Sequence, residues 1–142
     1  MRDIKDEIID AYTWHCRIEA ASYKMMGEML DDEMVRKRLK RWQISDVYIY
    51  GGTYLAAQLY RAIKNYTKVR AVVDRAGRSV LKMDVPVITL EELQKIYVKE
   101  KVIITPPRFY REAKNELAQF IELNNILYLG EFLEGVSRGE MG

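Results

Sequence analysis

A glycine-containing turn is the part of this sequence best suited to binding chemistry. The residues Gly51-Gly52-Thr53-Tyr54-Leu55-Ala56 follow a short apolar run, as does the Gly-x-Gly-x-x-Gly turn that holds a dinucleotide pyrophosphate. Gly51 and Ala56 fill its first and third positions, but Thr53 replaces the second glycine and puts a branched side chain where the phosphates approach. We therefore expect a single phosphate, bound by the Thr53 and Tyr54 amides and the Thr53 hydroxyl at a helix N-terminus. A pyrophosphate is expected to bind less readily.

Asp74 is a second candidate, because it closes the next apolar run about twenty residues downstream. An acidic side chain at this place can accept hydrogen bonds from both ribose hydroxyls of a nucleotide. The alternative is a structural role, in which Asp74 caps the turn through Gly77 and is stabilised by Arg75. The sequence leaves both interpretations open.

The remaining candidates follow from the rule that ligands of an open parallel sheet bind outside the carboxyl ends of its strands. Thr105 and Pro106 come after the fourth predicted strand, and Pro107 completes a rigid wall there. Tyr54 and Tyr110 begin predicted helices at the same edge, where an aromatic ring can stack on a base or sugar. The predicted binding residues are Gly51, Gly52, Thr53, Tyr54, Asp74, Arg75, Thr105, Pro106 and Tyr110. Neither a catalytic residue nor a metal site is assigned.

His15 and Cys16 are the other residues with chemical potential. One Cys and one His cannot form an internal disulfide or a zinc site of thiolates and imidazoles. As neighbours on a predicted helix they point about 100° apart, so they cannot act as a nucleophile and its base. We expect a core or interface role, with His15 facing a partner helix.

The elements that must position these residues alternate between strands and helices. Apolar and β-branched runs predict strands at residues 46–50, 69–74, 85–89, 101–105 and 126–129, followed by a weakly apolar tail. Helical spacing predicts helices at residues 53–65, 90–97 and 108–123. Thr89 and Glu92 have the spacing of a capping box for the second of these helices. Nearly continuous apolar strands separated by helices predict an α/β fold, a five-stranded parallel Rossmann-like sheet with helices on both faces.

The first 43 residues are predicted to form a separate helical segment. Residues 3–30 lack proline and show a broad apolar face. Such a helix would be about 40 Å long, more than is needed to cover a small sheet. Residues 34–42 predict a second, short helix, so the segment is one long helix or a helical hairpin. We expect it to mediate homo-oligomerisation or docking, ahead of a Rossmann-like domain at residues 44–135 and a flexible tail at residues 136–142.

Charge and hydropathy exclude several classes of protein. The 142 residues include 23 Lys plus Arg and 21 Asp plus Glu, and this balance gives no electrostatic argument for binding nucleic acid. The dense basic run at residues 36–41 is offset by neighbouring acidic residues, which favours a solvated helix face. No apolar run approaches the ~20 residues of a membrane span, and the N-terminus lacks an apolar signal core. We expect a cytoplasmic protein with no nucleic-acid partner and no membrane span.

In this order, the pieces of the sequence resemble a known module, the Rossmann-like sugar-nucleotide-associated domain found beside bacterial glycosyltransferases and other surface-polysaccharide genes. The resemblance covers roughly residues 34–135. It rests on Tyr48-Ile49-Tyr50-Gly51, Val72-Val73-Asp74-Arg75, Val85-Pro86-Val87-Ile88-Thr89-Leu90-Glu91-Glu92-Leu93, Ile103-Ile104-Thr105-Pro106 and Phe109-Tyr110-Arg111-Glu112. It implies a module that binds a nucleotide or nucleotide-sugar, works with a glycosyltransferase and has no strong catalytic activity of its own.

Two other interpretations compete with this one. The first is an assembly module whose degenerate turn binds nothing and whose N-terminal helix pairs with its copy or with a partner enzyme. The second is a NAD-dependent oxidoreductase, which needs a substrate domain and a proton-transfer residue. A chain of 142 residues has room for neither a substrate domain nor such a residue, so the oxidoreductase is the least favoured interpretation.

Overall fold

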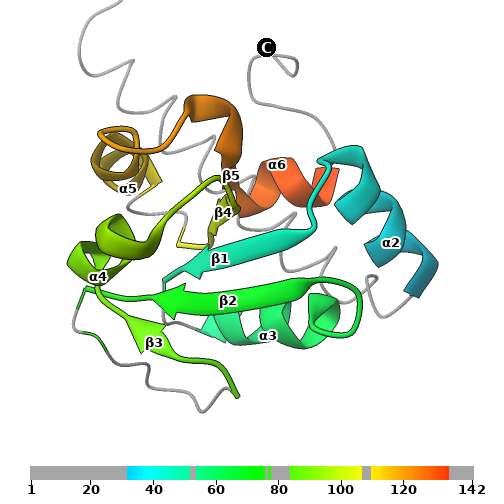
Figure 1. Ribbon diagram of the computed structural model, residues 1–142. Helices are drawn as coiled ribbons and strands as arrows, with labels where there is room; N and C mark the ends of the chain where they lie inside the picture. Colours follow the sequence, from blue (N-terminus) through cyan, green and yellow to red (C-terminus); the bar gives the residue numbers. More distant parts are fainter. Residues whose placement is uncertain (1–31, 52–53, 76, 78–83, 107–109, 135–142) are drawn as a thin grey trace, which may run out of the picture.

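The computed structural model of the chain describes residues 32–51, 54–75, 77, 84–106 and 110–134. The long helix predicted at residues 3–30 and the tail predicted at residues 136–142 lie outside this part. The elements run in the order α2 (Asp32–Arg41), β1 (Asp46–Tyr50), α3 (Tyr54–Ile63), β2 (Lys68–Val73), β3 (Val87–Ile88), α4 (Leu90–Ile96), β4 (Lys101–Ile104), α5 (Tyr110–Leu117), the 3-10 turn η1 (Leu123–Asn125), β5 (Ile126–Tyr128) and α6 (Leu129–Glu134) (Figure 1).

The five strands form one sheet in the order β3-β2-β1-β4-β5. Every neighbouring pair is parallel, which confirms the predicted five-stranded parallel sheet. β1 lies in the centre, with β2 on one side and β4 on the other (Figure 1). The strand order therefore reverses between β1 and β4, the place where open parallel sheets bind ligands.

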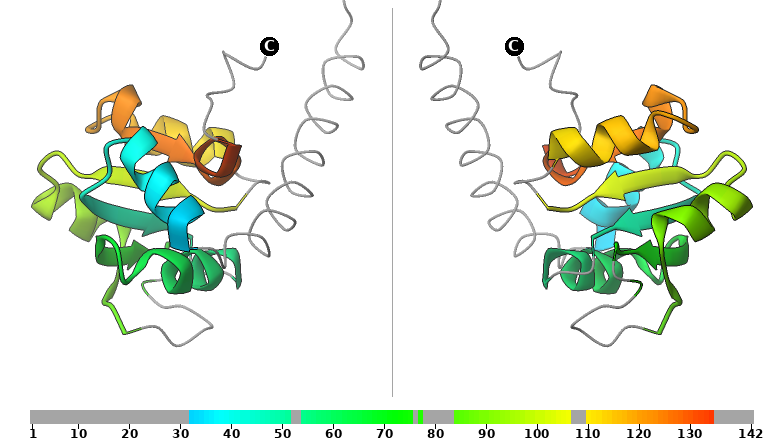
Figure 2. Two further views of the ribbon diagram at one scale, coloured as in Figure 1. Left: turned by 90° about the vertical axis from the view of Figure 1, so that its right-hand side faces the viewer. Right: turned by 90° about the vertical axis from the view of Figure 1, so that its left-hand side faces the viewer.

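Alternate strand residues face two separate cores, one on each side of the sheet. Val47 and Ile49 of β1 pack with α2, α3 and α6. Tyr48 and Tyr50 point the other way and pack with α4 and α5. In Figure 2, α2 is nearest the viewer on the left, and α4 and α5 are nearest on the right. Helices on both faces are thus confirmed, and α2 shares a core with the sheet although it precedes the expected domain boundary at residue 43.

Residues 129–134 form α6, where the sequence predicted a strand ending at residue 129 and then a weakly apolar tail. Leu129, Phe132 and Leu133 are fully buried and have the spacing of one helix face. They fill the core beneath α2 and α3. A helix of six residues is too short for its period to stand out in the sequence, so only the packing reveals it.

α4 begins with the predicted capping box. The Glu92 amide donates to Thr89 Oγ1 at 3.2 Å, and the Thr89 amide donates to Glu92 Oε1 at 3.4 Å. These bonds satisfy backbone groups that a helix start leaves free, so α4 has a fixed beginning directly after β3. Of the helices in the described ranges, none is long and apolar enough to cross a membrane.

Candidate functional site

The segments that follow β1 and β4 touch at the carboxyl edge of the sheet. Gly51 ends β1 with a φ of +110°, and an added Cβ would lie 2.7 Å from Thr105 Oγ1 and 2.8 Å from Pro106 Cδ. The backbone amide and the hydroxyl of Thr105 both donate to the Tyr50 carbonyl at 3.0 Å. The structure therefore brings three predicted residues together, with only glycine fitting at position 51. The Thr105 hydroxyl is buried and already bonded within the protein.

β2 ends beside this contact and places Asp74 and Arg75. The Gly51 amide donates to the Val73 carbonyl at 2.7 Å, and the Gly77 amide donates to the Asp74 carbonyl at 3.0 Å. The backbone of Asp74 thus begins a turn to Gly77, and neither proposed role of its side chain is settled by this bond. The Arg75 guanidinium extends to α5, where it pairs with Glu116 Oε1 at 2.8 Å.

Glu116 joins Arg75 and Tyr50 in a polar cluster on the α5 side of this edge. The Tyr50 hydroxyl donates to Glu116 Oε2 at 3.4 Å. Burial raises the pKa of Tyr50 above its ordinary value, against the opposing effect of Arg75, so the hydroxyl stays protonated at neutral pH. Sequence reasoning missed Glu116, because its place depends on how α5 is rotated over the sheet.

Tyr110 begins α5 but is mostly buried, with 5% of its surface exposed. Its ring lies 4.7 Å from the Tyr128 ring, and its hydroxyl accepts from Lys114 Nζ at 3.2 Å. The hydroxyl also lies 3.5 Å from Glu131 Oε1, and that carboxylate accepts the Tyr128 amide at 3.3 Å. No pattern in the sequence indicates that Glu131 is buried. In this structure the Tyr110 ring is occupied by protein contacts.

The remaining predicted residues are Gly52, Thr53 and Tyr54. Gly52 and Thr53 lie outside the described residues, while Tyr54 begins α3, and the N-terminus of a helix is the positive end of its dipole. Together with Asp74 and Arg75, which follow β2 at the same edge of the sheet, it offers groups that bind anions and hydroxyls. Within the described ranges, no group of three or more His, Cys, Asp and Glu side chains could hold a metal ion. Comparisons of the chain with protein-family models, curated proteins and solved structures find no match.

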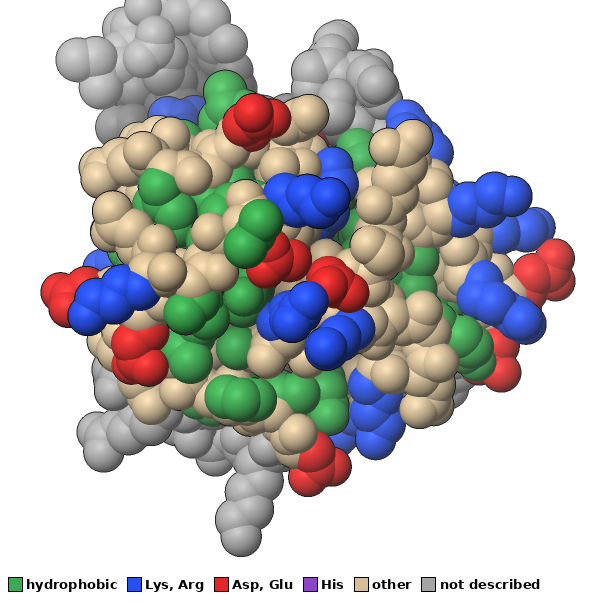
Figure 3. Space-filling model, in the orientation of Figure 1, with side chains coloured by type: hydrophobic (Ala, Val, Ile, Leu, Met, Phe, Trp, Pro, Cys, Tyr) green, Lys and Arg blue, Asp and Glu red, His purple; other side chains and the backbone are tan. Residues whose placement is uncertain are grey.

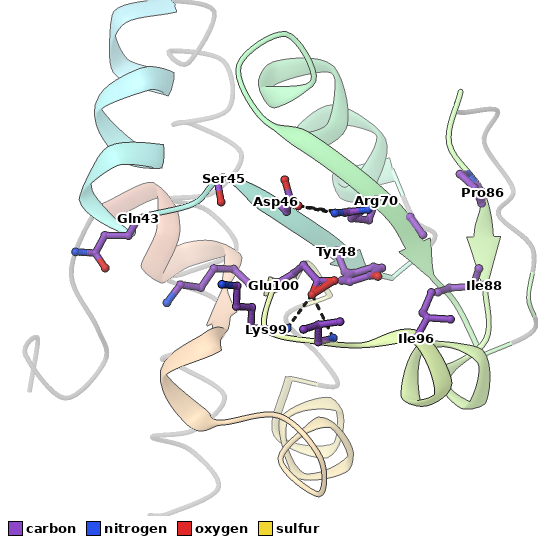
Figure 4. A pocket seen from close by; sticks show the side chains of 13 residues that line it. Gln43, Ser45, Asp46, Tyr48, Arg70, Pro86, Ile88, Ile96, Lys99 and Glu100 are labelled. Carbon is purple, nitrogen blue, oxygen red and sulfur yellow. Dashed lines mark hydrogen bonds and ion pairs between the residues drawn. The ribbon is translucent and has the colours of Figure 1, made fainter.

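A groove of about 650 Å³ lies elsewhere on the sheet, towards the amino ends of β1 and β4. Tyr48 and Ala71 lie on the face that packs with α4 and α5, and Ile96 and Val98 line the groove from α4 and the loop after it. Gln43 and Pro86 lie towards opposite ends of the groove (Figure 4). None of the predicted binding residues lines it. Sequence reasoning missed the groove because it depends on how much of the sheet α4 covers.

Polar groups in the groove bind one another. Arg70 pairs with Asp46 Oδ2 at 2.8 Å, and the Glu100 carboxylate accepts the Lys99 amide at 2.8 Å and the Val98 amide at 3.2 Å (Figure 4). Burial acts to raise the pKa of Glu100, but the backbone amides and the Tyr48 hydroxyl outweigh it and lower that pKa. Burial and the Glu100 carboxylate raise the pKa of Tyr48 to about 12. These pairings leave the groove better suited to docking than to acid–base chemistry.

Proposed function

We propose that the chain is a cytoplasmic module that binds a nucleotide or nucleotide-sugar at the carboxyl edge of the sheet, between β1 and β4. One observation carries the proposal: the strand order reverses here, and Gly51 turns the chain at positive φ directly after β1. Open parallel sheets bind ligands at such a reversal, with a phosphate at the N-terminus of the helix that follows. α3 supplies that helix.

The proposed roles follow from where the residues come in the chain. The turn of Gly51, Gly52 and Thr53, with the first amides of α3, binds a phosphate. Arg75 adds a cation: its side chain is 61% exposed, and an exposed ion pair such as Arg75–Glu116 contributes little, so a ligand phosphate can replace the carboxylate at small cost. The Asp74 carboxylate accepts hydrogen bonds from the ribose hydroxyls.

The biological context of the proposal comes from the resemblance. A module of this kind beside a glycosyltransferase would bind a sugar donor for surface-polysaccharide synthesis, with no strong catalysis of its own. The second candidate function is an assembly module with a degenerate nucleotide site. The exposed Ile96 and Val98 at the groove favour it.

A thermal-shift screen tests the proposed function. The ligands are NAD, NADP, ATP, coenzyme A and a panel of UDP-, GDP- and CDP-sugars. A ligand at a hundred times its dissociation constant adds about 2.7 kcal/mol to the free energy of unfolding, so the Tm rises by several degrees. We expect one nucleotide class to produce this rise, whereas silence across the panel would favour the assembly module.

Paired variants then locate the site. Thr53→Glu puts a negative charge at the start of α3 and should abolish the ligand-induced rise in Tm. Gln119→Glu adds the same charge at an exposed position outside the predicted site and should leave the rise intact. If Thr53→Glu keeps the full response, the phosphate does not bind at this turn.

A further inference from the structure

Exposed apolar side chains gather at the groove. In the described ranges, the exposed large hydrophobic residues are Ile96 (53%), Val98 (76%) and Leu123 (62%), and the first two line the groove. α4 has only seven residues and leaves part of the β1–β2 face open. Figure 3 shows Lys, Arg, Asp and Glu side chains near the middle of this view, with hydrophobic side chains around them. Exposed apolar side chains that gather in one place, here beside charged ones, are typical of a surface that docks another protein segment.

The first 31 residues have the chemistry to fill this groove. They carry seven acidic and four basic side chains, while the whole chain carries 21 and 23, so the remainder of the chain has a basic excess. Opposite net charges favour association of the two parts. The segment also has the broad apolar face predicted above, which includes Ile8 and Ile18.

Glu19 is the charged residue within this apolar face. It lies three residues after Cys16 and four before Tyr23, so a helix would place the three on one face. A carboxylate within an apolar face needs a cation when that face is buried. Lys99 is exposed on the groove and has the required charge.

We propose that residues 1–31 of a second copy of the chain dock in this groove, with their apolar face on Ile96 and Val98 and with Glu19 beside Lys99. A second copy is favoured over the same chain because α2, which follows directly at Asp32, packs on the opposite face of the sheet from the groove. Reciprocal docking gives a closed dimer, in which each copy supplies one segment and one groove.

Light scattering on the full chain tests the surface. We expect the wild-type protein to have twice the mass of one 16.7 kDa chain. Ile96→Asp with Val98→Asp should give the mass of one chain, while Leu123→Asp, an equally exposed position outside the groove, should leave the dimer intact. Circular dichroism checks that each variant is folded. A monomeric wild type, or a dimer that survives the double substitution, overturns the proposal.

Charge exchange and crosslinking test whether residues 1–31 of the second copy are the segment that docks in the groove. Glu19→Lys should weaken the dimer at least about tenfold, and adding Lys99→Glu in the same chain should restore it. The Val98→Cys variant should form a bismaleimide crosslink between position 98 and the native Cys16, identified by peptide mass spectrometry in the two-chain band, whereas Leu123→Cys should form none. Absence of charge rescue, or a crosslink from Cys16 to position 98 found only in the one-chain band, overturns docking of the second copy's segment.

Discussion

At the scale of single residues, the backbone conformation and close neighbours of Gly51 exclude any side chain at this position. Its φ is +110°, and a Cβ there would approach Thr105 Oγ1 to 2.7 Å. Gly51→Ala should therefore lower the free energy of unfolding by about 2 kcal/mol, measured by urea denaturation. Gly77→Ala is the control, because its φ is +70° but its nearest neighbour, Thr89 Cγ2, is 3.2 Å away. Equal losses of stability in the two variants would show that the positive φ alone, without the close contact to Thr105, requires glycine at position 51.

Glu100, which lines the groove, makes the free energy of unfolding depend on pH. Its pKa is lowered in the folded state, so its stabilising effect is complete above the ordinary value of 4.5 and is lost as the pH falls through the lowered value. The free energy of unfolding of the wild type should therefore fall more steeply than that of Glu100→Gln between about pH 5 and pH 3. Urea denaturation at each pH measures both slopes. Parallel slopes would contradict the role assigned to the amide bonds from Val98 and Lys99.

At the scale of elements, the capping box of α4 supports the wall of the groove. Thr89→Ala removes the side-chain acceptor for the Glu92 amide and should cost about 1 kcal/mol of stability. Glu91→Gln changes an exposed first-turn side chain outside the box and should cost less. Chemical denaturation compares the two variants. A larger loss for Glu91→Gln would mean that charge at the helix start matters more than the cap.

The elements also show what the sequence can predict. β1 runs from Asp46 to Tyr50 as expected, because a β-branched and aromatic run ends at glycine. Residues 85–89 form only a two-residue strand, and the helix predicted to residue 123 ends at Leu117, since element ends depend on tertiary packing. Parallel topology alone brings Gly51 near Thr105. The positions of Glu116 and Glu131, and the existence of the groove, depend on how short helices sit on the sheet, which local patterns do not encode.

At the scale of the whole molecule, β1 contributes to both of the proposed sites. Its carboxyl end holds the proposed nucleotide turn at Gly51, and Asp46 and Tyr48 lie in the groove nearer its amino end. No residue that lines the groove belongs to the predicted binding set, and effects at sites without shared contacts are additive.

The two proposed activities should therefore be independent. Ile96→Asp with Val98→Asp should change the mass of the assembly and leave the ligand-induced rise in Tm unchanged. Thr53→Glu should remove that rise and leave the mass unchanged. Light scattering and thermal shift on the same samples measure both properties. A variant that alters both would show that the sites are coupled, and β1 would be the element that links them, since it is the central strand and contacts β2 and β4 along its length.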